Sequence, residues 1–160
     1  MIILLMGPAA SGKGTYAEML SKKIKVPSIS MGELLRQFAQ KSDYGKELKE
    51  KYWGKGLLVP DDITLDVLNQ SFDKKGFILD GFPRNIEQAK ALDKAMAQKS
   101  RAIDKVINIV VSQEEVLRRL GGRWICRNCQ APYHEVDNPP KVKGKCDRCG
   151  GELYQRADDN

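Results

Sequence analysis

The stretch GPAASGK, residues 7–13, has the composition of an anion-binding loop. Gly7, Gly12 and Lys13 stand at the spacing G-x-x-x-x-G-K, after six apolar residues and before a helical pattern. Glycines let the backbone curl so that several N–H groups face one anion, and the start of the following helix adds the positive end of its dipole. The strand, the spacing and the lysine together predict a phosphate-binding loop and disfavour a strand-to-helix turn with incidental glycines. Gly14 stands between Lys13 and Thr15, where the strict motif has Ser or Thr directly after the lysine.

The second group of chemically active side chains consists of four cysteines. Two C-x2-C pairs, Cys126 with Cys129 and Cys146 with Cys149, are separated by sixteen residues. This spacing is typical of a tetrahedral thiolate site, for which zinc is the leading candidate, with disulfides and an iron–sulfur cluster as alternatives. Because four thiolates leave no open coordination position, the metal is expected to be structural.

Composition limits the setting in which these groups work. The chain has 160 residues, 41% hydrophobic and 30% charged, with a net charge of +6, which predicts one soluble domain with room for an inserted subdomain. The positive charge suits phosphate or nucleic acid, but many lysines fall on expected helix surfaces, so an ordinary solvated exterior is favoured. No apolar run approaches the ~18 residues of a membrane span, and the opening MIILLM lacks the basic region of a signal peptide. A cytoplasmic location is therefore expected.

Strand and helix patterns alternate along the first three quarters of the chain. Buried strands are expected at 1–6, 26–30, 76–80 and 105–111, and helices at 13–24, 31–40, 46–56, 60–72, 85–99 and 113–120. Ser112 is expected to cap the last helix, with Glu115 completing a capping box. Such alternation predicts a parallel α/β sheet with helical crossovers. From Gly121 onward glycine, proline, lysine and cysteine dominate, so a small inserted module is expected at about 122–156.

Four segments occur in an order that resembles a known family: GKGT at 12–15, ISMGELLR at 29–36, KGLLVPDD at 55–62 and LDGFPRNIEQA at 79–89. With them the chain resembles the adenylate kinase family of nucleoside monophosphate kinases over its whole length, and its cysteine module resembles the zinc-bearing lid of some bacterial members. The resemblance implies a P-loop NTPase-type parallel sheet flanked by helices, with an inserted monophosphate-binding segment and a small lid. The implied parts are a core at 1–29 and 60–121, an AMP-binding segment at 30–59, a zinc-binding lid at 122–156 and the start of a return to the core at 157–160.

The resemblance also implies the chemistry and the residues that carry it. The reaction would be reversible phosphoryl transfer from ATP to AMP, giving two ADP, with Mg²⁺ on the nucleotide and structural Zn²⁺ in the lid. The implied catalytic residues are Lys13, Arg84, Arg119, Arg123 and Arg156. The implied ATP contacts are Ala10, Ser11, Gly12, Lys13, Gly14, Thr15, Arg123, Pro132 and Tyr133. The implied AMP contacts are Met31, Arg36, Leu57, Leu58, Val59, Gly81, Arg84, Gln88 and Arg156. Asp80 would hold Mg²⁺ through water, and the partners would be nucleotides alone, with no nucleic acid, no membrane and a monomeric chain.

Three departures from the family pattern and several alternatives accompany this hypothesis. Ala10 stands where the family has glycine, so a positive φ there would be strained. Met31 stands where a threonine commonly touches the acceptor base. The family continues after RADDN with further helices and a strand, so we expect an interrupted chain whose strand at 105–111 has an open edge. The alternatives are a UMP or CMP kinase, a nucleotide- and zinc-binding fragment without turnover, and a nucleic-acid-binding zinc ribbon, which would not explain the phosphate loop. Arg118 is expected to be an ordinary surface residue, and His134 to serve lid packing or nucleotide contact.

Overall fold

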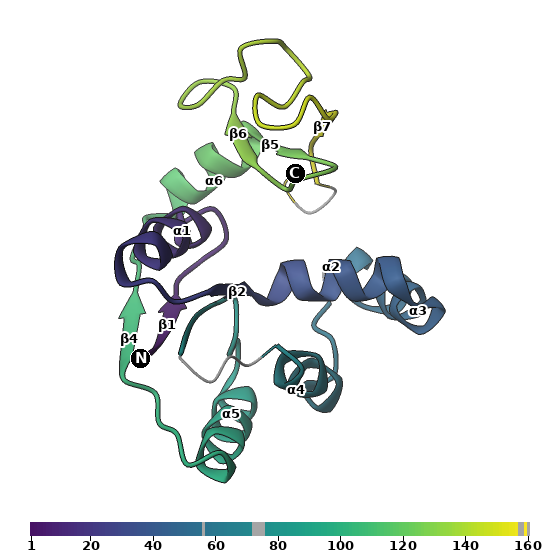
Figure 1. Ribbon diagram of the computed structural model, residues 1–160. Coiled ribbons are helices and arrows are strands. Elements are labelled where there is room, and N and C mark those ends of the chain that lie inside the picture. Colours follow the sequence, from purple (N-terminus) through teal and green to yellow (C-terminus); the bar gives the residue numbers. More distant parts are fainter. Residues whose placement is uncertain (56, 72–75, 157–158, 160) are drawn as a thin grey trace. The chain divides into compact units, whose positions relative to one another are not determined.

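The described residues form two compact units, Met1–Val110 and Val111–Asn160 (Figure 1). The computed structural model describes residues 1–55, 57–71, 76–156 and 159. The expected return to the core at 157–160 therefore lies outside the described residues except at Asp159. The predicted functional parts divide the chain differently, because the helix at 113–121 belongs to the same compact unit as the cysteine module.

The first unit is built on a four-stranded parallel sheet. Its strands are β1 (Ile2–Met6), β2 (Ser28–Ser30), β3 (Phe77–Asp80) and β4 (Lys105–Asn108), in the order β2-β3-β1-β4. In the register of the central strands, Leu4 of β1 lies opposite Leu79 of β3 and Val106 of β4. This confirms the predicted parallel α/β sheet of the P-loop type.

Alternate side chains of β1 enter two separate apolar cores. Ile3 and Leu5 pack with Ala17 of α1 (Lys13–Ile24). Ile2 and Leu4 pack on the other face, in a core that also contains residues of α4 (Asp61–Asn69) and α5 (Ile86–Gln98). Because successive residues of a strand point to opposite faces, a strand covered on both sides must be apolar throughout. This accounts for the unbroken apolar run at the start of the chain.

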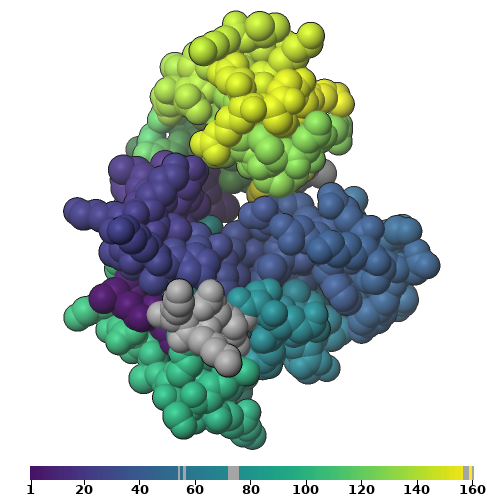
Figure 2. Space-filling model, viewed as in Figure 1, coloured from purple at the N-terminus to yellow at the C-terminus, as the bar shows by residue number. Residues whose placement is uncertain are grey.

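A helical lobe is inserted between β2 and β3. It comprises α2 (Met31–Lys41), α3 (Asp43–Lys51), a short 3₁₀ turn at Trp53–Lys55 and α4, and Figure 2 shows its α2–α3 part in blue at the side of the first unit. The Ser42 hydroxyl caps α3 by accepting from the Gly45 backbone N–H at 2.9 Å. A Cβ on Gly45 would lie 2.4 Å from the Phe38 carbonyl oxygen, so glycine allows α3 to turn closely against α2.

The second unit contains α6 (Gln113–Gly121) and a small antiparallel sheet. The strands β5 (Arg123–Cys126), β6 (Pro132–His134) and β7 (Leu153–Tyr154) are ordered β6-β5-β7. Its buried core consists of five residues with Trp124 packed against them: Cys126, Ala131, Tyr133, Cys146 and Leu153. So small an apolar core is a sign that something besides hydrophobic burial holds this unit together.

The start of α6 and the end of β4 differ in part from what the sequence predicts. The Ser112 hydroxyl accepts the Glu115 backbone N–H at 3.3 Å, which confirms the cap, but the Glu115 side chain bonds arginines instead of closing a capping box. The strand expected at 105–111 ends at Asn108 and lies at one edge of the described sheet, with Val110 84% exposed. In the described part of the chain, no helix is long and apolar enough to span a membrane.

Candidate active site and metal centre

The loop between β1 and α1 has the backbone of an anion cradle. Gly7, Ala10 and Gly12 have φ values of 139°, 56° and 91°, so the chain reverses its curvature repeatedly over a few residues. Ala10 has a positive φ, so the strain expected in that case is present, at the left-handed geometry that costs a residue with a Cβ about 1 kcal/mol. Gly12 is the N-cap of α1 and provides no side-chain cap, and the first turn has no acidic residue. No side chain of the N-cap residue therefore competes with an anion at this helix start.

Lys13 folds back along this loop. Its Nζ donates to the carbonyls of Gly7 at 2.9 Å and Pro8 at 2.6 Å, and lies 3.4 Å from Oγ of Ser11, which is buried. The ammonium is thus fixed over the loop's own backbone, while Gly14 and Thr15 are exposed on the first turn of α1. A cation at this place complements an anion bound by the loop amides.

Asp80 brings a carboxylate to the same place from the end of β3. A Cβ on Gly14 would lie 3.7 Å from Asp80 Oδ2, so the carboxylate borders the first turn of α1. Burial raises the pKa of Asp80, and the positive charges of Lys13 and Arg84 oppose that rise. The structure therefore gathers Lys13, Asp80 and Arg84 at the carboxyl ends of adjacent strands, where ligands bind in such sheets.

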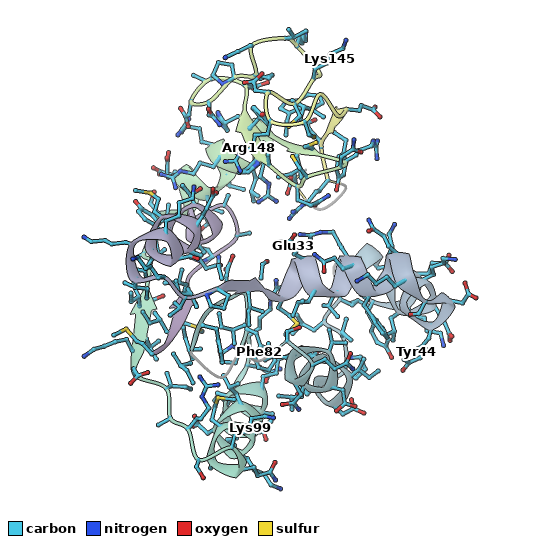
Figure 3. The ribbon with its side chains drawn as sticks, in the orientation of Figure 1. Glu33, Tyr44, Phe82, Lys99, Lys145 and Arg148 are labelled. Atoms are coloured by element: carbon cyan, nitrogen blue, oxygen red, sulfur yellow. The ribbon has the colours of Figure 1, made fainter. Side chains whose placement is uncertain are left out.

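Arg84 is held at the mouth of the loop that follows β3. Its Nε donates to the Gly81 carbonyl at 3.0 Å, and a Cβ on Gly81 would lie 3.7 Å from its Nη2. Phe82, labelled in Figure 3, anchors this loop by its burial in the core, and the Phe82–Pro83 peptide bond is cis. The Arg84 side chain is exposed, so its guanidinium is accessible to an anion.

The residues expected to bind the acceptor nucleotide lie in different environments. Met31 is only 3% exposed and belongs to the apolar core, whereas Leu57 and Leu58 are 56% and 46% exposed and Val59 is buried. Arg36 folds over Gly32, whose Cβ would lie 3.3 Å from its Nη1. Gln88 is buried, with both ends of its amide hydrogen-bonded inside the unit. The side chain of Met31 therefore acts in packing, and among the residues expected at the base Leu57 and Leu58 are the exposed ones.

Two of the three arginines expected from the second unit, Arg119 and Arg123, bond carboxylates. Arg123 donates from Nε to Asp159 Oδ2 at 2.9 Å, and its Nη2 contacts Oδ1 of the same carboxylate. Arg119 donates from Nε to Glu115 Oε1 at 2.7 Å. The Nε of Arg156 is buried and has no hydrogen-bond partner within the described ranges. The carboxylates of Asp159 and Glu115 each orient the guanidinium that they bind.

Glu115 holds a second arginine as well. Arg118 donates from Nε to Glu115 Oε2 at 2.7 Å and from Nη2 to Asp137 Oδ2 at 2.7 Å, so it ties α6 to the turn after β6. Arg118 is exposed, as expected, but it is not an isolated surface side chain. Hydrogen bonds from Arg118 and Arg119 lower the pKa of Glu115 to about 2.

The four cysteine sulfurs converge on one point. All lie within 4.8 Å of one another, with Cys126 3.5 Å from Cys149 and Cys129 3.5 Å from Cys146. Four ligands at the zinc–thiolate distance of 2.3 Å in a tetrahedron would be about 3.8 Å apart. Four thiolates this close repel one another unless a cation neutralises them, so the donor set fits a metal ion.

The thiols differ in acidity because their neighbours differ. Burial opposes ionisation of Cys146, but hydrogen bonds from the Tyr133 hydroxyl and from backbone N–H groups lower its pKa to about 6. A backbone hydrogen bond from Ala131 favours the thiolate of Cys129, yet burial and the neighbouring sulfurs raise its pKa to about 12. A bound cation would remove this difference, because each coordinated sulfur is then a thiolate.

Two of the residues expected to touch ATP from the lid, Tyr133 and Pro132, lie in different environments. Tyr133 is buried beside the cysteines, where its hydroxyl lies 3.4 Å from Cys146 Sγ and accepts the Asp147 backbone N–H at 2.7 Å. Pro132 is exposed. His134 accepts two backbone N–H groups at Nδ1, from Val136 at 3.2 Å and Asp137 at 3.1 Å, which supports the packing role expected for it.

Comparison with known proteins assigns the chain to a family. Residues 5–151 match the family model described as adenylate kinase. The chain belongs to the adenylate kinase family. A protein named adenylate kinase from Caldicellulosiruptor bescii is 49% identical over 164 residues, which cover 99% of this chain and 76% of that protein. Adenylate kinases from Staphylococcus aureus strain Mu50 and Archaeoglobus fulgidus are 50% and 48% identical, over 100% and 99% of this chain and 76% and 75% of their own lengths.

Adenylate kinase membership makes the chain one of a family of phosphotransferases that bind nucleotides, as its sequence motifs indicated.

Three carboxylates in the described residues were not predicted from the sequence to position a neighbouring side chain: Asp61, Glu115 and Asp159. Only Glu115 left a local signal, since Arg118 and Arg119 follow it at the i+3 and i+4 positions of a helix face. Asp159 lies 36 residues from Arg123, so only the fold reveals that pair.

Proposed function

We propose that this chain catalyses reversible, Mg²⁺-dependent transfer of the terminal phosphoryl group of ATP to AMP, giving two ADP. The observation that carries the proposal is the convergence of Lys13, Asp80 and Arg84 at the amino end of α1, beside a loop with three positive-φ residues. Phosphoryl transfer needs positioning and charge neutralisation more than covalent catalysis, and this is what cations and loop amides supply.

Each part of the site has a proposed task. The loop from Ala10 to Thr15 binds the ATP phosphates through its amides, and the Lys13 ammonium exchanges its carbonyl partners for phosphate oxygens. We assign to Asp80 the task of holding, through water, the Mg²⁺ that accompanies ATP. Arg36 and Arg84 bind the monophosphate of AMP, because a planar guanidinium matches two phosphate oxygens. We assign charge neutralisation on the transferring group to Arg119, Arg123 and Arg156.

We also assign roles to the acceptor-binding segment, the lid and the four cysteines. The segment at 30–59 binds AMP, with Leu57, Leu58 and Val59 against its base together with Gln88, while Gly81 lets the Arg84 loop approach the phosphate. Pro132 and Tyr133 contact the donor nucleotide, Tyr133 through its backbone because its side chain is buried. The four cysteines bind Zn²⁺, which holds the lid at 122–156 together; a closed set of four thiolates leaves the ion no catalytic position.

The test is a product assay with matched variants. The purified chain is mixed with ATP, Mg²⁺ and AMP, UMP or CMP, and nucleoside diphosphates are separated by chromatography. ADP should form fastest with AMP, with two ADP for each ATP consumed. Lys13→Met should lower kcat at least about 100-fold, the scale of losing one preorganised charge contact, whereas Lys94→Met, on the exposed side of α5, should leave it unchanged. Absence of product with every acceptor would refute the proposal, and faster turnover of UMP or CMP would reassign the acceptor.

A further inference from the structure

The side-chain amide of Gln88 is hydrogen-bonded at its oxygen to a donor and at its nitrogen to an acceptor. Its Oε1 accepts the backbone N–H of Arg84 at 2.7 Å, and its Nε2 donates to Oδ1 of Asp61 at 2.8 Å. The backbone N–H of Gln88 donates to Oδ1 of Asn85, the N-cap of α5, at 2.7 Å. Gln88 is 2% exposed, so the two polar ends of its side chain depend on these protein partners in place of water.

This pairing permits only one orientation of the amide. A backbone N–H can only donate, and a carboxylate can only accept. Turning the amide over would oppose its NH₂ to the N–H of Arg84 and its oxygen to the carboxylate of Asp61. Both contacts would be repulsive, and two buried polar groups would lose their partners at a cost of about 1–3 kcal/mol each. Of the two groups that fix the amide, Asp61 is the one that a side-chain substitution can change.

The fixed amide retains one donor and one acceptor. A primary amide has two N–H donors and two oxygen lone pairs, and one of each is used inside the protein. Adenine offers an amino donor at C6 beside an acceptor at N1, whereas a 6-oxopurine offers an acceptor at C6 beside an N1–H donor. One base therefore pairs with the amide in the orientation that Asp61 fixes, and the other pairs with the reverse orientation.

Asp61 is also close in sequence to the expected acceptor-binding segment. It follows Leu57, Leu58 and Val59 by a few residues and begins α4, so its bond to Gln88 joins that segment to the loop that carries Arg84. The neighbouring Asp62, also in the first turn of α4, is exposed and gives a matched control for charge and helix position.

We propose that Asp61 is a specificity-determining positioning residue, which fixes the Gln88 amide in the orientation that accepts a 6-aminopurine monophosphate and rejects a 6-oxopurine monophosphate. This inference rests on the proposed function, because it assigns the base that the proposed acceptor site selects. Asp61 need not touch the nucleotide; it acts through Gln88.

The test compares AMP with inosine monophosphate, which differ only at C6 and in the proton on N1. Dissociation constants for both are measured by titration calorimetry, and kcat/KM for both with MgATP, in the wild type, Asp61→Asn and Asp62→Asn. The wild type and Asp62→Asn should prefer AMP by about 10-fold to 100-fold, the range of one bidentate base contact. In Asp61→Asn the asparagine can present oxygen or NH₂ to Gln88, so the preference should fall at least about 5-fold, with tighter binding of inosine monophosphate.

A purely structural role for Asp61 predicts a different pattern. Damage to the fold would weaken both nucleotides together and leave their ratio unchanged, which would overturn the inference. In a Gln88→Leu background, Asp61→Asn should no longer alter the ratio, since the group through which it acts is gone. If the wild type binds neither nucleotide, the proposed function fails and the inference fails with it; if the wild type uses AMP but the ratio survives Asp61→Asn, the inference alone fails.

Discussion

The carboxylate of Glu115 shows how one residue can position another. It accepts from Arg118 at 2.7 Å and from Arg119 at 2.7 Å, and these hydrogen bonds lower its pKa to about 2. A depressed folded-state pKa means that the ion pairs are fully formed above the unfolded value of about 4.3 and are lost only as the pH falls toward 2. Carbon-detected NMR of the Glu115 carboxyl should therefore give a titration midpoint below 3. In Arg118→Met the midpoint should rise toward 4, and a wild-type midpoint already near 4 would contradict the assignment.

Single residues differ in how far the sequence alone could identify them. Lys13 and the cysteines could be predicted because each belongs to a motif whose spacing is local and whose chemistry is specific. Asp61 and Asp159 could not, since their partners Gln88 and Arg123 are 27 and 36 residues away. A carboxylate that positions another side chain has no spacing rule of its own, so only the fold reveals it.

At the scale of elements, the strand-to-helix turn after β1 depends on Gly7, which has a positive φ and leaves no room for a Cβ. Gly7 has φ 139°, and a Cβ there would lie 2.5 Å from the Ile109 carbonyl oxygen. Gly7→Ala should therefore lower the free energy of unfolding of the first unit by about 1–3 kcal/mol, the usual cost of a strained backbone position. Urea titration followed by Trp53 fluorescence, in a Trp124→Phe background, measures this unit by itself.

Gly14, in the first turn of α1, provides the control for that substitution. Gly14 is helical, and a Cβ there would be in ordinary contact, 3.7 Å from Asp80 Oδ2. Gly14→Ala should leave stability unchanged or raise it by up to about 1 kcal/mol, because glycine is costly within a helix. Equal effects of the two substitutions would show that the close approach at Gly7 does not limit the loop.

Sequence periodicity located the elements well but predicted β4 too long. The strand ends at Asn108, and no change in the apolar pattern marks that end.

At the scale of the whole molecule, the two units rely on different sources of stability. The first has apolar cores on both faces of its sheet, whereas the second has one apolar cluster of five buried residues, two of which are cysteines. Binding of a structural zinc to thiolates contributes about 10–16 kcal/mol in small peptides, more than so few buried side chains can supply after the entropy of folding is subtracted. The metal proposed for the cysteines is therefore expected to determine whether the second unit folds.

The two tryptophans of the chain allow each unit to be followed separately, since Trp53 lies in the first unit and Trp124 in the second. Trp124 packs against the core that contains Cys126 and Cys146, and Trp53 packs against the core of the sheet. Removal of the metal with a strong chelator should shift the emission of Trp53→Phe to longer wavelength, as Trp124 becomes exposed, and added Zn²⁺ should reverse the shift. The emission of Trp124→Phe, which reports Trp53, should not change. A shift in both variants would mean that the units unfold together, and a shift in neither would mean that the second unit folds without the ion.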